Sequence, residues 1–106
     1  NGKFEDAIEE CKIAIDLDPD YGNPYNDIGS YLINLDRYDD AVYWLEKAIE
    51  APDYEPRYFP YYNLGRVYEK KGSWYTALKY YSDALKINPN YELAKNAFVR
   101  LTAMMN

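Results

Sequence analysis

Apolar residues recur at helical spacing along most of the chain, most clearly in the segment 58–71. There Tyr61, Leu64, Val67 and Tyr68 follow one another at offsets of three, six and seven positions from the first. This spacing places their side chains on one face of an α-helix. The segment therefore predicts an amphipathic helix.

The sequence also predicts where this helix ends and where the next one begins. Glycine readily adopts the left-handed conformation that closes a helix, so Gly72 predicts the stop, and Lys70 and Lys71 suit the negative end of the helix dipole. A second stripe predicts a helix over residues 73–87, and Pro89 follows its end. The apolar positions of that second stripe are Trp74, Ala77, Tyr81, Ala84 and Leu85. Residues 58–91 thus predict one helix-turn-helix unit.

Four further helices are predicted by similar stripes, over residues 3–17, 23–35, 38–50 and 91–105. Pro24 falls in a first turn, where its missing N–H costs nothing, and Asp39 and Asp40 favour the positive end of the helix at 38–50. The fold class predicted is all-α with about six helices.

Between residues 51 and 60 the pattern is disturbed by three of the six prolines, which predict a longer and stiffer connector. Its aromatic residues, Tyr54, Tyr58 and Phe59, have two interpretations. They could contact a partner, or they could cover the neighbouring helix.

The helices repeat at a fixed interval. Ala7 and Ala41 are 34 residues apart, and Gly29 and Gly65 are 36 apart. The turn segments 2–4, 36–38 and 72–74 repeat a stop residue, a polar residue and an aromatic, and the segments 17–21 and 87–91 match at the repeat exit. Periods of this size are typical of stacked helical pairs.

These residues resemble the tetratricopeptide repeat family. The leading-helix pattern of that family appears as Tyr61, Leu64, Gly65 and Tyr68, and less fully as Tyr25, Ile28, Gly29 and Leu32. The trailing-helix pattern of alanine, a large residue and alanine appears in three sets: Ala7, Cys11 and Ala14; Ala41, Leu45 and Ala48; Ala77, Tyr81 and Ala84. The resemblance implies a right-handed α-solenoid of helix-turn-helix repeats.

The organisation expected is a single domain over residues 1–106. It comprises a trailing half-repeat (1–21), a repeat (22–57), a second repeat (58–91) and a C-terminal capping helix (92–106). The last helix departs from the family pattern because Lys95 replaces the large aromatic and Val99 the glycine. In the two complete repeats, Gly29, Gly65 and the alanines opposite them predict close helix approach, near the short end of about 8–10 Å.

The charge and composition of the chain limit the partners and activities that can be expected of it. The chain has 12 basic and 18 acidic residues and therefore a net charge of −6. This negative charge argues against nucleic acid or an anionic membrane as the partner. No histidine and one cysteine are present, so we expect no catalytic residues, no metal site and no cofactor. The alternating Asp16, Asp18 and Asp20 resemble a calcium loop, but Pro19 and a late glycine favour the repeat exit instead.

A lone cysteine allows no intramolecular disulfide and favours a reducing compartment, so a cytoplasmic location is expected. Cys11 lies on an apolar stripe and is interpreted as a small buried hydrophobe. Because the sequence begins without Met and within a repeat, we also expect it to be part of a longer protein.

The resemblance implies that the leading helices line a concave groove that holds a partner peptide. By position this groove would comprise Asn23, Asn26, Asp27, Ser30, Asn34, Tyr62, Asn63, Arg66, Lys70, Asn96 and Arg100. Asparagine amides can pair with an extended backbone, and the three basic residues could take an acidic group. The carboxylate clamp of some relatives is not implied, because only Asn63 matches it and its basic positions fall on Leu93 and Ala97.

The function predicted is a protein-interaction scaffold and not an enzyme. Two alternatives remain open. The uncovered apolar stripe from Phe4 to Ile15 could make the chain assemble with copies of itself. The chain could also be a regulatory segment of a larger enzyme.

Overall fold

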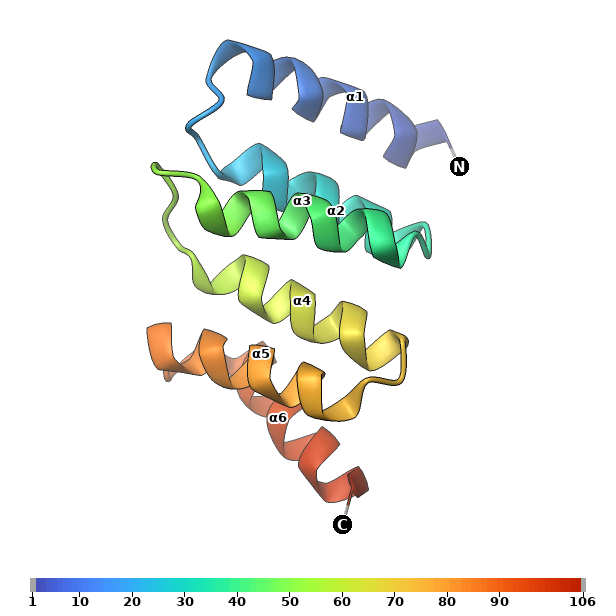
Figure 1. The fold of residues 1–106 in the computed structure, drawn as a ribbon, viewed down its shortest axis with the longest axis vertical. Coiled ribbons are helices and arrows are strands. Elements are labelled where there is room, and N and C mark those ends of the chain that lie inside the picture. Colours follow the sequence, from blue (N-terminus) through green and yellow to red (C-terminus); the bar gives the residue numbers. More distant parts are fainter. Residues whose placement is uncertain (1, 106) are drawn as a thin grey trace. The chain divides into compact units, whose positions relative to one another are not determined.

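The fold consists of helices joined by short turns and loops (Figure 1). A computed structural model of the chain describes residues 2–105, which form six helices. They are α1 (Gly2–Leu17), α2 (Asn23–Asn34), α3 (Tyr38–Glu50), α4 (Tyr58–Lys70), α5 (Trp74–Ile87) and α6 (Glu92–Met105). The all-α prediction is confirmed, and every helix end lies within one residue of the predicted one.

The chain divides into two compact units. The N-terminal unit, Asn1–Pro56, contains α1, α2 and α3, and the C-terminal unit, Arg57–Asn106, contains α4, α5 and α6. In each unit, every helix packs against the next one along the chain.

The two short turns that join a leading to a trailing helix use the left-handed conformation. Gly72 has a φ of 80°, as its position at the predicted helix stop required. Asp36 takes the same role in the other turn with a φ of 60°, and its carboxylate accepts a 2.8 Å hydrogen bond from the Tyr38 hydroxyl. Gly2, the third member of the predicted set, instead lies at the start of α1.

Close packing within the helix pairs is confirmed, but the glycines meet different partners from those predicted. A Cβ atom on Gly29 would lie 2.4 Å from the Leu45 side chain, and one on Gly65 would lie 2.4 Å from the Tyr81 ring. Each glycine thus faces the large central residue of the trailing helix and not its alanines. The alanines lie three or four positions from that residue, on the same face of the trailing helix, and are fully buried. Both large residues are at most 1% exposed.

The connector between the units covers part of the N-terminal unit. Asp53 donates its N–H to the Asp20 carbonyl (3.0 Å) and accepts the Gly22 N–H (2.8 Å). Tyr54 is 3% exposed and lies directly against Gly22, where a Cβ would come within 2.4 Å of the ring. Of the two interpretations of the Tyr54 side chain, the covering role is the one that this burial supports.

Residues 2–105 contain no helix with the length and apolar character needed to span a membrane.

Candidate functional site: a basic pocket between α4, α5 and α6

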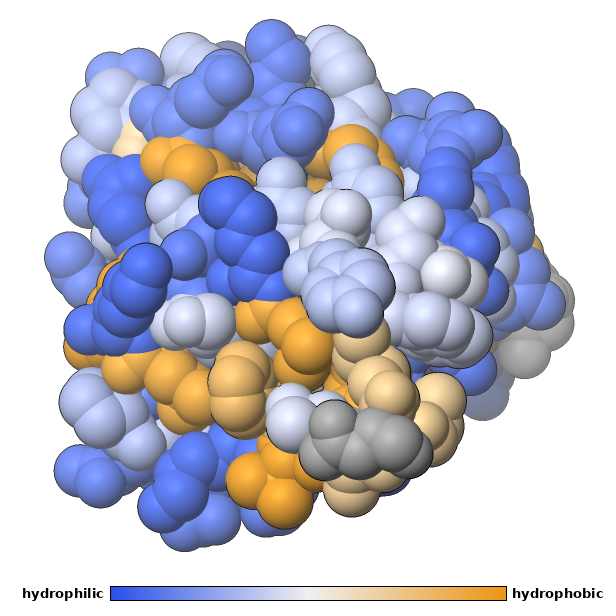
Figure 2. Space-filling view, turned by 60° about the horizontal axis from the view of Figure 1, so that its bottom comes forward, coloured by the Kyte–Doolittle hydropathy of each residue, from blue (hydrophilic) through white to orange (hydrophobic). Residues whose placement is uncertain are grey.

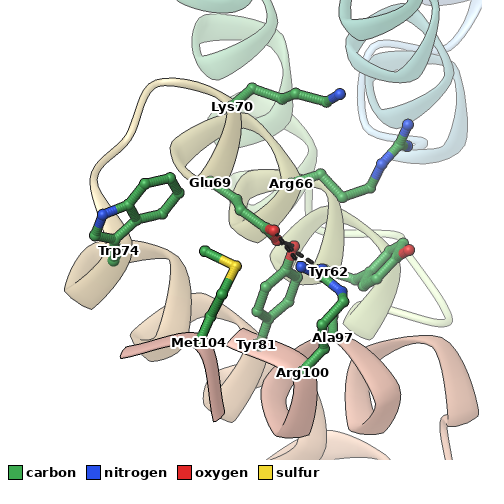
Figure 3. A pocket seen from close by; sticks show the side chains of 9 residues that line it. All are labelled: Tyr62, Arg66, Glu69, Lys70, Trp74, Tyr81, Ala97, Arg100 and Met104. Atoms are coloured by element: carbon green, nitrogen blue, oxygen red, sulfur yellow. Dashed lines mark hydrogen bonds and ion pairs between the residues drawn. The ribbon is translucent and has the colours of Figure 1, made fainter. Parts of the chain in front are cut away.

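The C-terminal unit holds an open pocket of about 430 Å³ between its three helices (Figure 3). Side chains one helical turn apart on α4 form one wall, and α5 and α6 supply the others. The nine lining residues are Tyr62, Arg66, Glu69 and Lys70 from α4, Trp74 and Tyr81 from α5, and Ala97, Arg100 and Met104 from α6. Three of these are cationic and one is anionic, so the pocket is locally basic within a chain of net charge −6.

An ion pair on one side of the pocket ties its helices together. Arg100 of α6 binds the Glu69 carboxylate of α4 with both guanidinium Nη atoms, at 2.5 and 2.9 Å. The Tyr81 hydroxyl of α5 donates to the same carboxylate at 2.8 Å. One carboxylate therefore joins all three helices through charge-assisted hydrogen bonds.

This network shifts the pKa values of both Glu69 and Tyr81. The Arg100 hydrogen bond lowers the pKa of Glu69, more than burial raises it, and the Tyr81 hydrogen bond lowers it further. Burial, followed by the hydrogen bond to Glu69, raises the pKa of Tyr81. At neutral pH Glu69 is a carboxylate and Tyr81 a neutral donor.

The stability of the C-terminal unit is expected to depend on the charge of Glu69. Its folded pKa lies below the usual 4.5, so its stabilising contribution is complete above that pH and is lost as the pH falls through the folded value. The measurement is urea unfolding of the wild type and of Glu69→Gln between pH 7 and pH 3. The difference in unfolding free energy should shrink on acidification. A difference that stays constant with pH would contradict this.

Arg66 and Lys70 carry the other two positive charges of the pocket, and the charge of Lys70 also helps to lower the pKa of Glu69. Within residues 2–105 neither forms an ion pair with a carboxylate. The Arg66 guanidinium donates to Asn63 Oδ1 (3.0 Å) and lies 6.0 Å from the centre of the Tyr62 ring. Lys70 is exposed. Figure 3 shows both side chains on the α4 side of the pocket.

Of the sequence-predicted site residues in this unit, the structure brings four together in the pocket: Tyr62, Arg66, Lys70 and Arg100. Asn63 is only 7% exposed and faces the interior. Asn96 is exposed on α6 but is not part of the pocket lining.

The predicted residues on α2 belong to the N-terminal unit. Asn23 and Asp27 line a second pocket, of about 350 Å³, between α1 and α2. Asn26 is buried, at 8% exposed, Ser30 is half-buried and Asn34 is exposed. Burial raises the pKa of the Asp27 carboxyl although part of the side chain stays in contact with solvent.

The sequence interpretation missed five pocket residues: Glu69, Trp74, Tyr81, Ala97 and Met104. Glu69 is three positions after Arg66, so its place on the same face of α4 could have been inferred from helical spacing. Its pairing with Arg100, 31 residues away, had no such signal.

Aromatic side chains surround the start of α6 next to this pocket. The Tyr91 ring lies 4.7 Å from Tyr58, 5.6 Å from Phe59 and 5.4 Å from Tyr62, measured between ring centres. Burial raises the pKa of Tyr91 to about 12, with Tyr62 and Tyr58 adding to the effect. Tyr58 and Phe59 thus help to hold α6 in place.

Helix pairs with a glycine of one helix against a large residue of the next define a helical repeat protein. Among residues 2–105, no group of three or more His, Cys, Asp or Glu side chains is placed to hold a metal ion. Comparison with known families agrees with this class. Residues 1–56 and residues 59–91 each match the sequence pattern described as the tetratricopeptide repeat. The chain belongs to the tetratricopeptide repeat family. Such repeats form helical solenoids, are in general non-catalytic scaffolds and mediate protein–protein interaction.

A relative from Haemophilus influenzae, described as an uncharacterized protein, is 30% identical over 53 residues. The match covers 50% of this chain and 30% of the length of that protein.

Proposed function

We propose that this protein binds a segment of a partner protein and that the pocket between α4, α5 and α6 takes an acidic group of that segment. The observation that carries the proposal is the pair of cations, Arg66 and Lys70, left over after Arg100 is bound to Glu69. A carboxylate entering the pocket would meet two donors that form no ion pair with a carboxylate within residues 2–105, although Lys70 is close enough to Glu69 to help lower its pKa.

The apolar residues that line the pocket indicate a second property of the ligand. Tyr62, Trp74 and Met104 line it beside the two cations, and Trp74 and Met104 keep 40% and 58% of their surface exposed. Aromatic and methionine side chains bind apolar groups without demanding one shape. The ligand proposed is therefore a peptide with an acidic residue, or a terminal carboxylate, close to an apolar side chain.

For the other predicted groove residues, a role in peptide binding remains a prediction. Asn23, Asp27, Ser30 and Asn34 on α2 are accessible at least in part, and asparagine amides suit contact with a peptide backbone. Asn26 and Asn63 are buried and would act by supporting their helices.

The test uses a library of synthetic ten-residue peptides in which a fixed leucine is followed by Glu or Gln. Wild type should retain the Glu peptides, and the double variant Arg66→Glu with Lys70→Glu should weaken their binding by roughly 10- to 100-fold, since two attractive charges become repulsive. Fluorescence anisotropy of labelled peptides measures the affinities. Arg100 is kept, because its guanidinium holds Glu69 and its loss would also lower stability.

A matched control is the double variant Lys47→Glu with Lys86→Glu. It makes the same change in net charge with two exposed lysines of α3 and α5 that do not line the pocket. Peptide affinity should stay near that of the wild type. If wild type shows no preference for Glu over Gln, or if the pocket variant keeps that preference, the proposal is wrong.

A further inference from the structure

Acidic side chains are rare in the unit that forms the basic pocket. The C-terminal unit has eight basic and three acidic residues, whereas the N-terminal unit has four basic and fifteen acidic ones. Two of the three acidic residues lie outside the pocket lining, since Asp83 forms ion pairs with Lys79 and Lys86 and Glu92 is exposed on α6. Glu69 is the third, and it is the single acidic residue among the nine that line the pocket.

The contacts of Glu69 are those of a carboxylate bound at an anion site. The two Nη atoms of Arg100 bind its two oxygens, at 2.5 Å to Oε2 and 2.9 Å to Oε1, and the Tyr81 hydroxyl donates to Oε1 at 2.8 Å. Figure 3 shows these contacts inside the pocket. A planar guanidinium that meets both oxygens of a carboxylate is also the arrangement with which proteins recognise the carboxylates of ligands. Arg100 and Tyr81 thus form a carboxylate site that the chain fills with its own side chain.

A ligand in the pocket can reach both members of this ion pair. The side chains of Glu69 and Arg100 keep 19% and 54% of their surface exposed, and both line the pocket. A glutamate side chain has several rotatable bonds, so its carboxylate can turn toward solvent while the backbone of α4 stays in place. The Arg100 guanidinium would then join Arg66 and Lys70 as a third cation for an acidic ligand.

Apolar surface lies close to Arg100 as well. Ala97 and Met104 of α6 line the pocket together with Arg100, and Met104 is 58% exposed. Figure 2 turns the α6 end of the chain toward the viewer and shows apolar residues grouped among polar ones. An acidic residue with an apolar neighbour therefore suits the surroundings of Arg100.

From this arrangement we infer that Glu69 competes with acidic ligands for Arg100 and thereby limits the affinity of the pocket for them. The inference rests on the proposed function, because it concerns the same pocket and the same class of ligand. While Glu69 holds Arg100, an acidic ligand binds Arg66 and Lys70 alone. A ligand carboxylate gains Arg100 when it displaces Glu69. One side chain thus stabilises the C-terminal unit and weakens its binding to acidic peptides.

The variant Glu69→Gln tests this competition, because glutamine has the size of glutamate and carries no charge to hold a guanidinium. The probes are labelled ten-residue peptides in which leucine is followed by Glu or by Gln, and fluorescence anisotropy measures their affinities. Glu69→Gln should bind the Glu peptide roughly tenfold more tightly than the wild type does, and the Gln peptide about as tightly. An affinity for the Glu peptide that is unchanged or lower would overturn the inference.

The measurements are made in trimethylamine N-oxide, because this uncharged osmolyte favours the folded state and offsets the stability that Glu69→Gln loses. Circular dichroism should show folded helices for every variant under these conditions. In the absence of the osmolyte, the free energy of unfolding of Glu69→Gln should be lower than that of the wild type. The substitution is thus expected to change stability and affinity in opposite directions.

A double variant separates contact with Arg100 from simple loss of repulsion. Removing a negative charge from the pocket could strengthen peptide binding even if the peptide never touched Arg100. In Glu69→Gln with Arg100→Lys the positive charge remains, but lysine lacks the planar fork that binds both oxygens. Most of the tenfold gain should disappear in this double variant. A gain that persists would show that Glu69 acts by repulsion alone and would overturn the competition for Arg100.

The matched control is Glu92→Gln, which makes the same change in net charge at an exposed position of α6 outside the pocket lining. Its affinity for the Glu peptide should stay near that of the wild type, and a gain equal to that of Glu69→Gln would contradict the role of Glu69. A wild type without preference for Glu over Gln would overturn the proposed function together with the competition. A preference in the wild type without a gain in Glu69→Gln would overturn the competition alone.

Discussion

Replacing Gly65 by alanine is expected to lower the free energy of unfolding by about 1–3 kcal/mol, although alanine is the better helix former. The added Cβ would lie 2.4 Å from Cε1 and 2.5 Å from Cδ1 of Tyr81. The ring cannot rotate away easily, because Tyr81 is buried and its hydroxyl is held by Glu69. The helices α4 and α5 would have to move apart, and the measurement is urea unfolding followed by circular dichroism.

The matched control is Gly2→Ala, because Gly2 is also helical but has no atom within 4 Å of the added Cβ. Its stability should be unchanged or slightly higher. A double-mutant cycle with Tyr81→Leu tests the contact itself, since a smaller partner makes room for the methyl group. The cost of Gly65→Ala should fall in the Tyr81→Leu background, and a cost that stays the same would rule out this clash as the cause.

Replacing Arg100 by alanine is expected to cost about 1–2 kcal/mol, because the half-buried Glu69 carboxylate loses both guanidinium hydrogen bonds. Glu69 is 19% exposed and Arg100 54%, so water replaces only part of what is lost. Thermal unfolding should show a lower melting temperature. The same experiment with Arg66→Ala, from the same pocket, should show a smaller loss since Arg66 holds no carboxylate within residues 2–105.

The charge pairing itself is isolated by the double variant Arg100→Ala with Glu69→Gln. Without the carboxylate there is no buried charge left to compensate, so the double variant should be more stable than the sum of the single losses predicts. Strict additivity would mean that Arg100 stabilises α6 by packing alone.

Local chemistry explains why so much of the fold could be predicted. Helix spans follow from apolar spacing, and the turn at Gly72 follows from the conformational freedom of glycine, both of which depend only on residues close in the chain. The sequence repeat identified Asp36 as the stop residue at the position of Gly72. In the structure both residues have the left-handed backbone conformation.

The candidate site could be predicted less completely. Helical spacing predicted Tyr62, Arg66 and Lys70 on one face of the helix, and the repeat added Arg100; all four line the pocket, while their role in binding stays a prediction. The same reasoning treated Arg100 as available for a ligand, whereas in the structure it binds Glu69. Spacing gives the face on which a residue lies, but not the partner that comes to that face from another helix.

The sequence by itself determined the six helices, the repeat and the positions that must be small, because each of these depends on interactions within a few turns or on copies of one pattern. Only the tertiary structure decided which large residue fills the space above each glycine and which charges of the pocket form an ion pair. Those outcomes depend on contacts between residues such as Glu69 and Arg100, 31 positions apart, which no local pattern encodes.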